Sequence, residues 1–286
     1  MIPELLTALT PQQVEIHGQI NFLPEGQGMN FISNRPVLNH PVLVLALTFL
    51  ALYLAALIGA FISRRRAPLK DGEQESFNLV MTSTLTLLAL LIGFSFSMAI
   101  SRYDQRKIYE EDEANAIGTE YLRADLLPPA AAQTVRTLLI TYLNQRILFY
   151  ETRDESQLQK IDAETARLQT DLWSAVQIQA VSTPSPVMAL VVSGMNDVLN
   201  AQGYTQASWW NRIPRGAWLL MAAISILSNI LIGYGMHQRG TNSAQLLILP
   251  LIFSVSFFLI SDIDSPRSGI IRVHPQNLAS LVQALH

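Results

Sequence analysis

Four long stretches without Asp, Glu, Lys or Arg constrain the fold of this chain more than any other feature of its sequence. They cover residues 36–63, 76–101, 216–236 and 240–261. Each stretch reaches the length of roughly 20 apolar residues that a helix needs to cross a bilayer. The sequence therefore predicts an all-α membrane protein with four transmembrane helices in two hairpins. The predicted helices span residues 41–63, 79–101, 216–236 and 243–261.

The composition excludes several classes of protein. Charged residues make up 14% of the chain, against about a quarter in typical soluble proteins. The net charge of −3 shows no basic excess, so nucleic acid is not expected as a partner. The chain has no Cys, which excludes disulfides and thiolate metal sites. The His residues are scattered and no nucleophile motif occurs, so we expect no enzyme activity.

Most of the charged residues lie in the segment 102–215, which should form a helical domain outside the membrane. A helix without proline should continue the second span and end at Pro128 and Pro129. Apolar residues at helical spacing then predict helices around residues 135–150, 158–176 and 188–199. Trp209, Trp210 and Trp218 fall where an aromatic belt at the membrane surface would lie.

The two ends of the chain are predicted to differ. Residues 1–40 are expected to be irregular, with one short helix near residues 4–9. Residues 262–286 form a C-terminal tail, and its part from residue 268 to residue 286 is too apolar to extend into water. This tail should pack against the helical segment 102–215, which is called the insert below.

An acidic run on the predicted long helix comprises Glu110, Glu111, Asp112 and Glu113, and continues to Glu120. Carboxylates are the ligands that Ca²⁺ prefers, so the run could attract a cation. A solvated helix face is the favoured interpretation, because the polar side of a surface helix normally faces water.

The second span has a distinctive stripe of hydroxyl, small and bulky residues: Thr82, Thr86, Leu90, Gly93, Phe94 and Ser97. Two interpretations stay open. Small and hydroxyl residues at this spacing serve close helix packing, whereas a pore-lining stripe would gate through a hydrophobic constriction around Leu90 and Phe94. None of the four spans contains an ionisable residue, which argues against a proton-coupled transporter.

The same span carries a resemblance to a known family. The string IGFSFSMAISRYDQRKIYEEDEANAIGTEYLRADLLP resembles the hallmark of the bacterial bestrophin-like membrane protein family. Within it, Gly93-Phe94 and Ser101-Arg102-Tyr103 are similar to the Gly-Phe and Thr-Arg-Trp pattern on the second helix of bestrophin anion channels. The string FFLISDIDSPRSGIIRVHPQNLASLV looks like a second signature of the bacterial family.

The resemblance implies a homo-oligomer, with a pentamer favoured, in the bacterial inner membrane. Its second helices would line a central pore for inorganic anions such as chloride. By position the neck of the pore would be Thr86, Leu90 and Phe94, of which only Phe94 keeps the aromatic type; the other two positions are Ile and Phe in animal bestrophins. The resemblance also implies Ca²⁺ after the fourth span. Asp262 and Asp264 are the candidate ligands there, with helix termination and capping as the favoured role; no other cofactor is expected.

The leading hypothesis is therefore an oligomeric, multi-pass, passive anion channel that is surrounded by membrane lipid. Its pore-lining residues would be Thr82, Thr86, Leu90, Phe94 and Ser97. The alternative is a non-conducting scaffold or sensor whose insert binds a partner through the acidic residues 110–113. Lys and Arg near the span ends favour one side of the membrane by number and the other by density, so the side that the insert faces is left open.

Overall fold

The computed structural model describes residues 40–238 and 243–285, which belong to one compact unit. All regular elements of the described residues are helical. The predicted irregular segment 1–40 and its short helix lie outside the described residues, apart from His40. In chain order the elements are α2 (Pro41–Arg64), α3 (Asp71–Arg123), η1 (Ala124–Leu126), α4 (Pro129–Glu151), α5 (Glu155–Ser182), α6 (Pro186–Trp210), α7 (Arg215–Gln238), η2 (Ser243–Leu247), α8 (Ile248–Asp264) and α9 (Gln276–Leu285).

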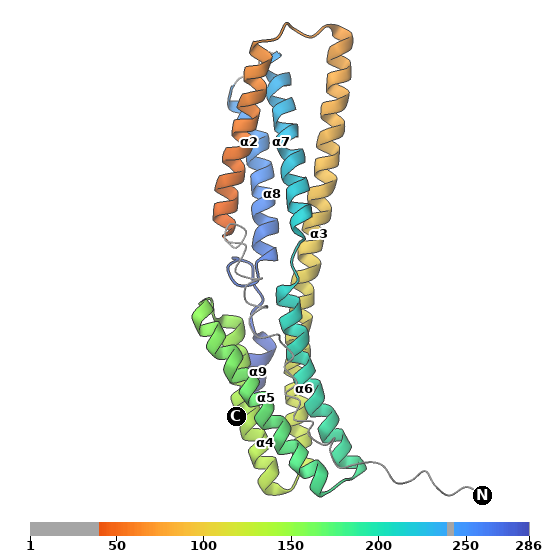
Figure 1. The fold of residues 1–286 in the computed structure, drawn as a ribbon, viewed down its shortest axis with the longest axis vertical. Helices are drawn as coiled ribbons and strands as arrows, with labels where there is room; N and C mark the ends of the chain where they lie inside the picture. The colour runs from red at the N-terminus through yellow and green to blue at the C-terminus, as the bar shows by residue number, and fades with distance from the viewer. Residues whose placement is uncertain (1–39, 239–242, 286) are drawn as a thin grey trace, which may run out of the picture. The chain divides into compact units, whose positions relative to one another are not determined.

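Helix α3 has 53 residues and runs through both the apolar part of the unit and the insert (Figure 1). Its first turn is fixed by the side chain of Glu73, which accepts a hydrogen bond from the Lys70 N–H (3.1 Å). No proline interrupts it. Pro129 begins α4 at a position where the missing N–H has no partner to lose. The predicted continuation of the second span as one long helix is confirmed.

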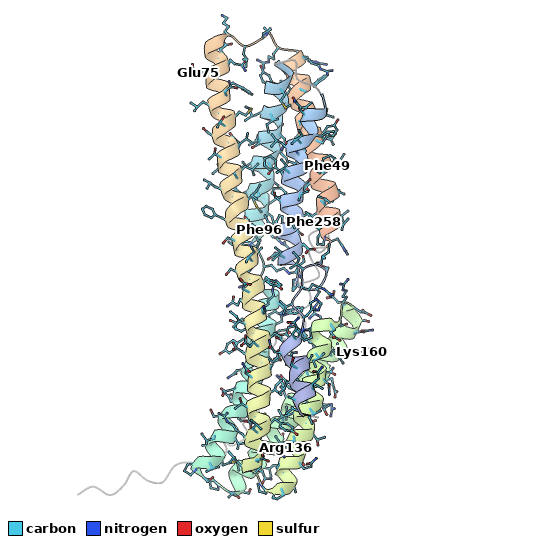
Figure 2. All side chains as sticks on the ribbon, turned by 180° about the vertical axis from the view of Figure 1, so that it is seen from behind. Phe49, Glu75, Phe96, Arg136, Lys160 and Phe258 are labelled. Atoms are coloured by element: carbon cyan, nitrogen blue, oxygen red, sulfur yellow. The ribbon has the colours of Figure 1, made fainter. Side chains whose placement is uncertain are left out.

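The apolar part consists of α2, α7, α8 and the first portion of α3, and these four helices are long and apolar enough to cross a membrane. Helices α7 and α8 lie between α2 and α3 (Figures 1 and 2). Helices α2 and α7 meet at glycines. A Cβ atom on Gly59 would lie 1.9 Å from the Ile230 oxygen, and one on Gly233 would lie 1.9 Å from the Ala56 oxygen. Small residues thus allow the close backbone approach that is typical of helices in a membrane.

The insert is built from the second portion of α3 together with α4, α5 and α6, around one apolar core. The side chain of Asp154 caps α5 by accepting from the Ser156 N–H (2.9 Å), and that of Ser185 caps α6 by accepting from the Met188 N–H (3.1 Å). The three helices predicted after residue 128 correspond to α4, α5 and α6. Helix α9 packs on α3 and α4, so the predicted contact of the tail with the insert is confirmed.

Trp209 is placed differently from the prediction. It is 5% exposed, and its ring packs against Phe149 and Tyr150 in the core of the insert. The Arg267 guanidinium lies over the Trp209 ring at 4.4 Å. The prediction of an interfacial belt is therefore wrong for this residue, because a tryptophan near the end of a helix can serve a water-surrounded core as well as a membrane surface.

Candidate pore face and its polar contacts

The predicted pore residues share an exposed side of α3. They are Thr82, Thr86, Leu90, Phe94 and Ser97, and all five are exposed in the single chain. At 100° per residue they fall within an arc of about 120°. Leu90 is 53% exposed and Phe94 is 68% exposed. The opposite side of α3 packs through Leu88 and Ala99, which are both 0% exposed.

Helix α3 is the least covered of the four apolar helices. In its most apolar stretch 11% of the residues are buried, against 28%, 33% and 44% in the stretches of the other three. An apolar helix of this length would not stay fully exposed to water. Lipid or other copies of the chain must therefore cover most of its surface. The difference marks α3 as the helix with the most surface to offer to a neighbour.

Two details bear on whether the stripe packs or lines a pore. A Cβ atom added at Gly93 would meet nothing within 4 Å, so this glycine serves no close contact inside the chain. The Thr86 hydroxyl donates to the Thr82 carbonyl oxygen (2.9 Å), which leaves its methyl group and oxygen lone pairs for the open face. Within one chain, close packing through small residues occurs between α2 and α7 and not along this stripe.

The family-motif residues that follow the stripe join α3 to other helices. Arg102 Nη1 donates to Asn211 Oδ1 (2.7 Å), in the link between α6 and α7. Tyr103 packs against the core of the insert and also against a small cluster that includes Ala99 and Ile213. These residues therefore fix the place where the insert meets the apolar helices.

Arg106 is a central residue of this junction that the sequence analysis missed as a site residue. It is 1% exposed, and its guanidinium donates to the carbonyl oxygens of Ser208 (3.3 Å), Ile263 (3.2 Å) and Asn211 (3.4 Å). Burial lowers the pKa of Arg106 to about 10, although the nearby Asp264 carboxylate raises it. Arg106 therefore keeps its positive charge at neutral pH and ties α3, the α6–α7 link and the end of α8 together.

The two candidate calcium ligands bind backbone N–H groups. Asp262 accepts from Ile270 (2.7 Å) and Ile271 (2.8 Å), and both oxygens of Asp264 accept from Ile213 (3.1 and 3.2 Å). Among the described residues no group of three or more His, Asp or Glu side chains is placed to hold a metal ion. The arrangement fits the predicted role in terminating α8 and ordering the following loop, and a calcium site here stays a prediction.

The acidic run does not form a uniformly solvated face, as the favoured interpretation held. Glu110, Glu113 and Glu120 are 1%, 0% and 0% exposed, whereas Glu111 and Asp112 are exposed. The buried three lie on the inward side of α3, in register with Arg106 and with Ile117 at 0% exposure. The helical spacing of these residues was the signal in the sequence that could have predicted their burial. Their charge favoured a solvent-exposed face instead.

Glu113 is the centre of a buried network. It forms an ion pair with Arg146, and it accepts hydrogen bonds from Tyr150 (3.3 Å) and Thr205 (3.1 Å). Burial lowers the pKa of Arg146, but the Glu113 carboxylate together with Tyr142 and Tyr150 outweighs burial and raises it. Burial and then Glu113 raise the pKa of Tyr150. The network therefore links α3, α4 and α6 around a buried ion pair, in which Arg146 Nη1 and Nη2 have no hydrogen-bond partner among the described residues.

Glu110 has a separate role at the tail. Its carboxylate accepts from the backbone N–H groups of Asn277 (2.9 Å) and Leu278 (3.0 Å) and from the Asn277 side chain (2.6 Å). These N–H groups lie in the first turn of α9, where a carboxylate also complements the helix dipole. Glu110 therefore holds α9 onto α3.

Four apolar helices of membrane-spanning length, joined to a helical insert, make the chain a multi-pass membrane protein. A family model described as Bestrophin-like domain matches residues 46–278, and the chain belongs to this bestrophin-like family. None of the curated proteins matches the sequence.

Solved structures confirm the fold. A variant of a bacterial bestrophin homolog from Klebsiella pneumoniae is 13% identical, with a TM-score of 0.58, over 86% of this chain and 97% of that chain. A structure described only as a variant of a membrane protein is 14% identical, with a TM-score of 0.60, over 84% of this chain and 97% of that chain. The predicted bestrophin-like, four-span fold is therefore confirmed.

Proposed function

We propose that the chain forms a passive, anion-conducting channel in which the exposed stripe of α3 lines the pore. The observation that carries the proposal is the low coverage of α3: 11% of its most apolar stretch is buried within the chain. Membership of the bestrophin-like family supports a channel of bestrophin type.

A pore along α3 requires several copies of the chain. A single chain covers only one side of α3, through α7 and α8, and leaves the stripe open. A closed ring of identical subunits places the same face of each copy around a common axis. We propose a homo-oligomer, with five subunits favoured by the family resemblance, and with lipid of a bacterial inner membrane around its outer helices.

The narrowest part of the proposed pore is a hydrophobic constriction at Leu90 and Phe94. These side chains lie one helical turn apart, and both are largely exposed. Apolar narrowings of this kind gate ion flow by losing or gaining water. The span contains no ionisable residue between positions 76 and 101, so transport would be passive and not coupled to protons.

The proposed preference for anions follows from the family resemblance. Arg102 is the first charged residue after the uncharged span, and it is held in place by Asn211. At 100° per residue, Arg102 and the buried Arg106 lie about 140° and 180° from the middle of the stripe, on the side of α3 that joins the other helices. The proposed anion preference therefore rests on the family resemblance and not on these two charges.

Flux of chloride and of sodium into liposomes tests this proposal. Leu90→Ala and Phe94→Ala should each raise chloride flux several-fold, because they widen the constriction. Phe96→Ala is the matched control: Phe96 is also exposed on α3, and at 100° per residue it lies about 160° away from Phe94. Unchanged flux in both stripe variants, or an equal rise in the control, would contradict a pore along this face.

The alternative function, a non-conducting scaffold or sensor, is supported by the surface of the insert. An open apolar hollow of about 570 Å³ lies between α5 and α6, lined by Trp173, Met188 and Val192 among others. Only Glu111 and Asp112 remain exposed from the acidic contact first considered. Absence of any ion flux, together with a partner lost on charge reversal at these two residues, would favour this alternative.

A further inference from the structure

Glu120 is a buried carboxylate without a hydrogen-bond partner. It is 0% exposed, and neither of its side-chain oxygens forms a hydrogen bond. Glu110 and Glu113, on the same side of α3, have their oxygens bound to N–H and O–H donors or to Arg146. A buried ionised carboxylate that lacks such partners is strongly disfavoured, whereas the neutral acid form is tolerated.

The carboxyl group of Glu120 packs against α6 in a space that exists only because residue 194 is a glycine. A Cβ atom on Gly194 would lie 2.0 Å from Glu120 Oε2 and 2.2 Å from Arg123 Nη1. The distance between Arg123 Nη1 and Glu120 Oε2 is 3.9 Å, which is too long for a hydrogen bond. The contact between α3 and α6 at this point therefore depends on the protonation state of one carboxyl group that forms no hydrogen bond within the described part of the chain.

The charged residues around Glu120 have opposite effects on its protonation. Burial raises the pKa of Glu120 to about 8; Arg123 on the same helix lowers it, and Asp197 on α6 raises it. Nearby, Asp125 of η1 is paired with Arg136 of α4. Helix α9, which also packs on α3, has no ionisable residue among its described positions.

We propose that Glu120 is a proton-binding site that joins α3 to α6, in which the protonated carboxyl is seated against Gly194 and loss of the proton weakens the helix contact. Because α3 continues without a break into the apolar part, the site connects proton binding to the helix that bears the exposed stripe. The inference goes beyond the proposed channel and does not depend on ion conduction.

The direction of the pH effect follows from the two protonation states. The pKa of Glu120 in the folded protein, about 8, lies above its ordinary value of 4.5. The folded state therefore binds more protons between these values. The stabilisation that protonated Glu120 provides is complete below about pH 4.5 and is lost as the pH rises through about 8.

The test is the thermal unfolding of the full-length protein in detergent, measured from about pH 6 to about pH 10. We expect the Tm of the wild type to fall relative to that of Glu120→Gln up to about pH 8 and the difference to stay constant above it, because the amide cannot ionise. Glu111→Gln is the matched control, since Glu111 is exposed on the same helix, and its Tm should follow the wild type.

Two further variants give opposite shifts that a merely structural role would not produce. Asp197→Asn removes a like charge and should move the pH at which the Tm difference levels off to a lower value, whereas Arg123→Gln removes an opposite charge and should move it to a higher value. Infrared spectra of the wild type at neutral pH should also show the C=O band of a protonated carboxylic acid that disappears as the pH rises through about 8 and is missing in Glu120→Gln.

Equal pH profiles for the wild type and Glu120→Gln would overturn the proposal, as would shifts of the same sign in the two charge variants. If Glu120→Gln does not fold, the wild-type infrared titration and the Asp197→Asn shift decide the question. A carboxylic acid band that is absent at neutral pH in the wild type would then contradict the proposal.

Discussion

The apolar helices and the insert hold together by different means. In the apolar part, α2 meets α7 at Gly59 and Gly233, where the two backbones come into direct contact. The ion pairs Arg146–Glu113, Arg136–Asp125 and Arg167–Glu164 all lie in the insert. The apolar helices are thus held together by close backbone contacts. The insert is held together by an apolar core and by charged networks.

This difference follows from the two solvents that the parts are built for. Helices in lipid gain little from burying apolar side chains, and their association depends on close packing and on satisfied polar groups. The insert gains stability by removing apolar surface from water, and it can then bury a charge only with a partner. Helix α3 serves both parts: it turns Leu90 and Phe94 outward in the first and Glu110 and Glu113 inward in the second.

Glu113→Ala should destabilise the insert most strongly while leaving the apolar helices unchanged. This change leaves Arg146 buried and unpaired, at 0% exposure, and should lower the free energy of unfolding by about 3–5 kcal/mol. Thermal or denaturant unfolding of the purified protein measures the effect. Glu111→Ala, on the exposed side of the same helix, is the control and should stay within about 0.5 kcal/mol. Equal effects of the two variants would mean that the buried network does not stabilise the insert.

The corresponding change in the apolar part is Gly233→Ala. Its Cβ atom would lie 1.9 Å from the Ala56 oxygen, so α2 and α7 must separate, at a cost of about 1–3 kcal/mol. Gly93→Ala is the control, since nothing lies within 4 Å of the added atom. Thermal unfolding in detergent measures the stability of both variants, and size-exclusion chromatography measures their assembly. If Gly93→Ala disrupted the assembly while the folded monomer survived, the α3 stripe would pack against a neighbouring copy and would not line a pore.

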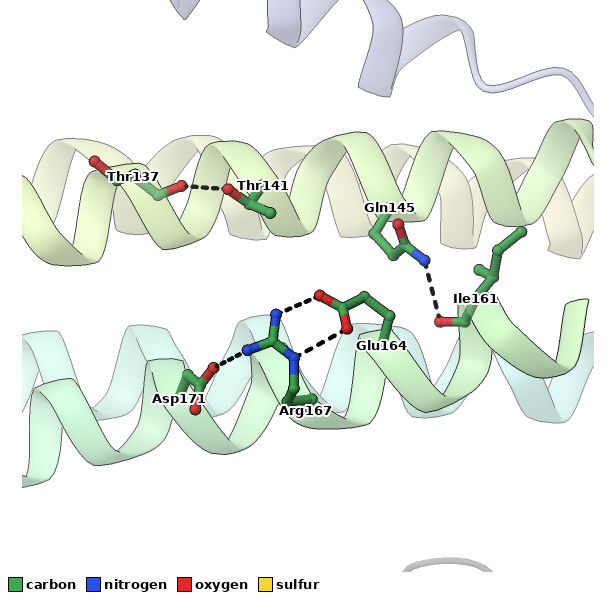
Figure 3. A network of polar contacts seen from close by, with 7 residues as sticks. All are labelled: Thr137, Thr141, Gln145, Ile161, Glu164, Arg167 and Asp171. Carbon is green, nitrogen blue, oxygen red and sulfur yellow. Dashed lines mark hydrogen bonds and ion pairs between the residues drawn. The ribbon is translucent and has the colours of Figure 1, made fainter. Parts of the chain in front are cut away.

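The smallest effect is expected on the outer surface of the insert, where Arg167 contacts Glu164 and Asp171 (Figure 3). These side chains are largely exposed, so solvent screens their attraction. Arg167→Ala should change the free energy of unfolding by less than about 0.5 kcal/mol, and added salt should reduce the change further. A loss of stability comparable to that of Glu113→Ala would show that exposed and buried ion pairs contribute equally to the insert. This result would contradict the prediction.

The sequence predicted the features that depend on composition and periodicity. The uncharged stretches predicted the four apolar helices, and the absence of proline between Arg102 and Leu127 predicted the length of α3. The burial of Glu110 and Glu113 was not predicted, because their partners Asn277, Leu278 and Arg146 are distant in the chain and become neighbours only in the fold. Trp209 was misplaced for the same reason. The role of the α3 stripe depends on contacts between copies, which neither the sequence nor one chain contains.

Imaging single particles of the detergent-solubilised assembly shows directly whether the exposed face of α3 lines a shared pore. We predict a ring of five subunits in which Leu90 and Phe94 face an open central axis. A dimer, or a ring whose axis is filled by lipid or by packed side chains, would contradict this prediction and would support the scaffold or sensor function of the insert.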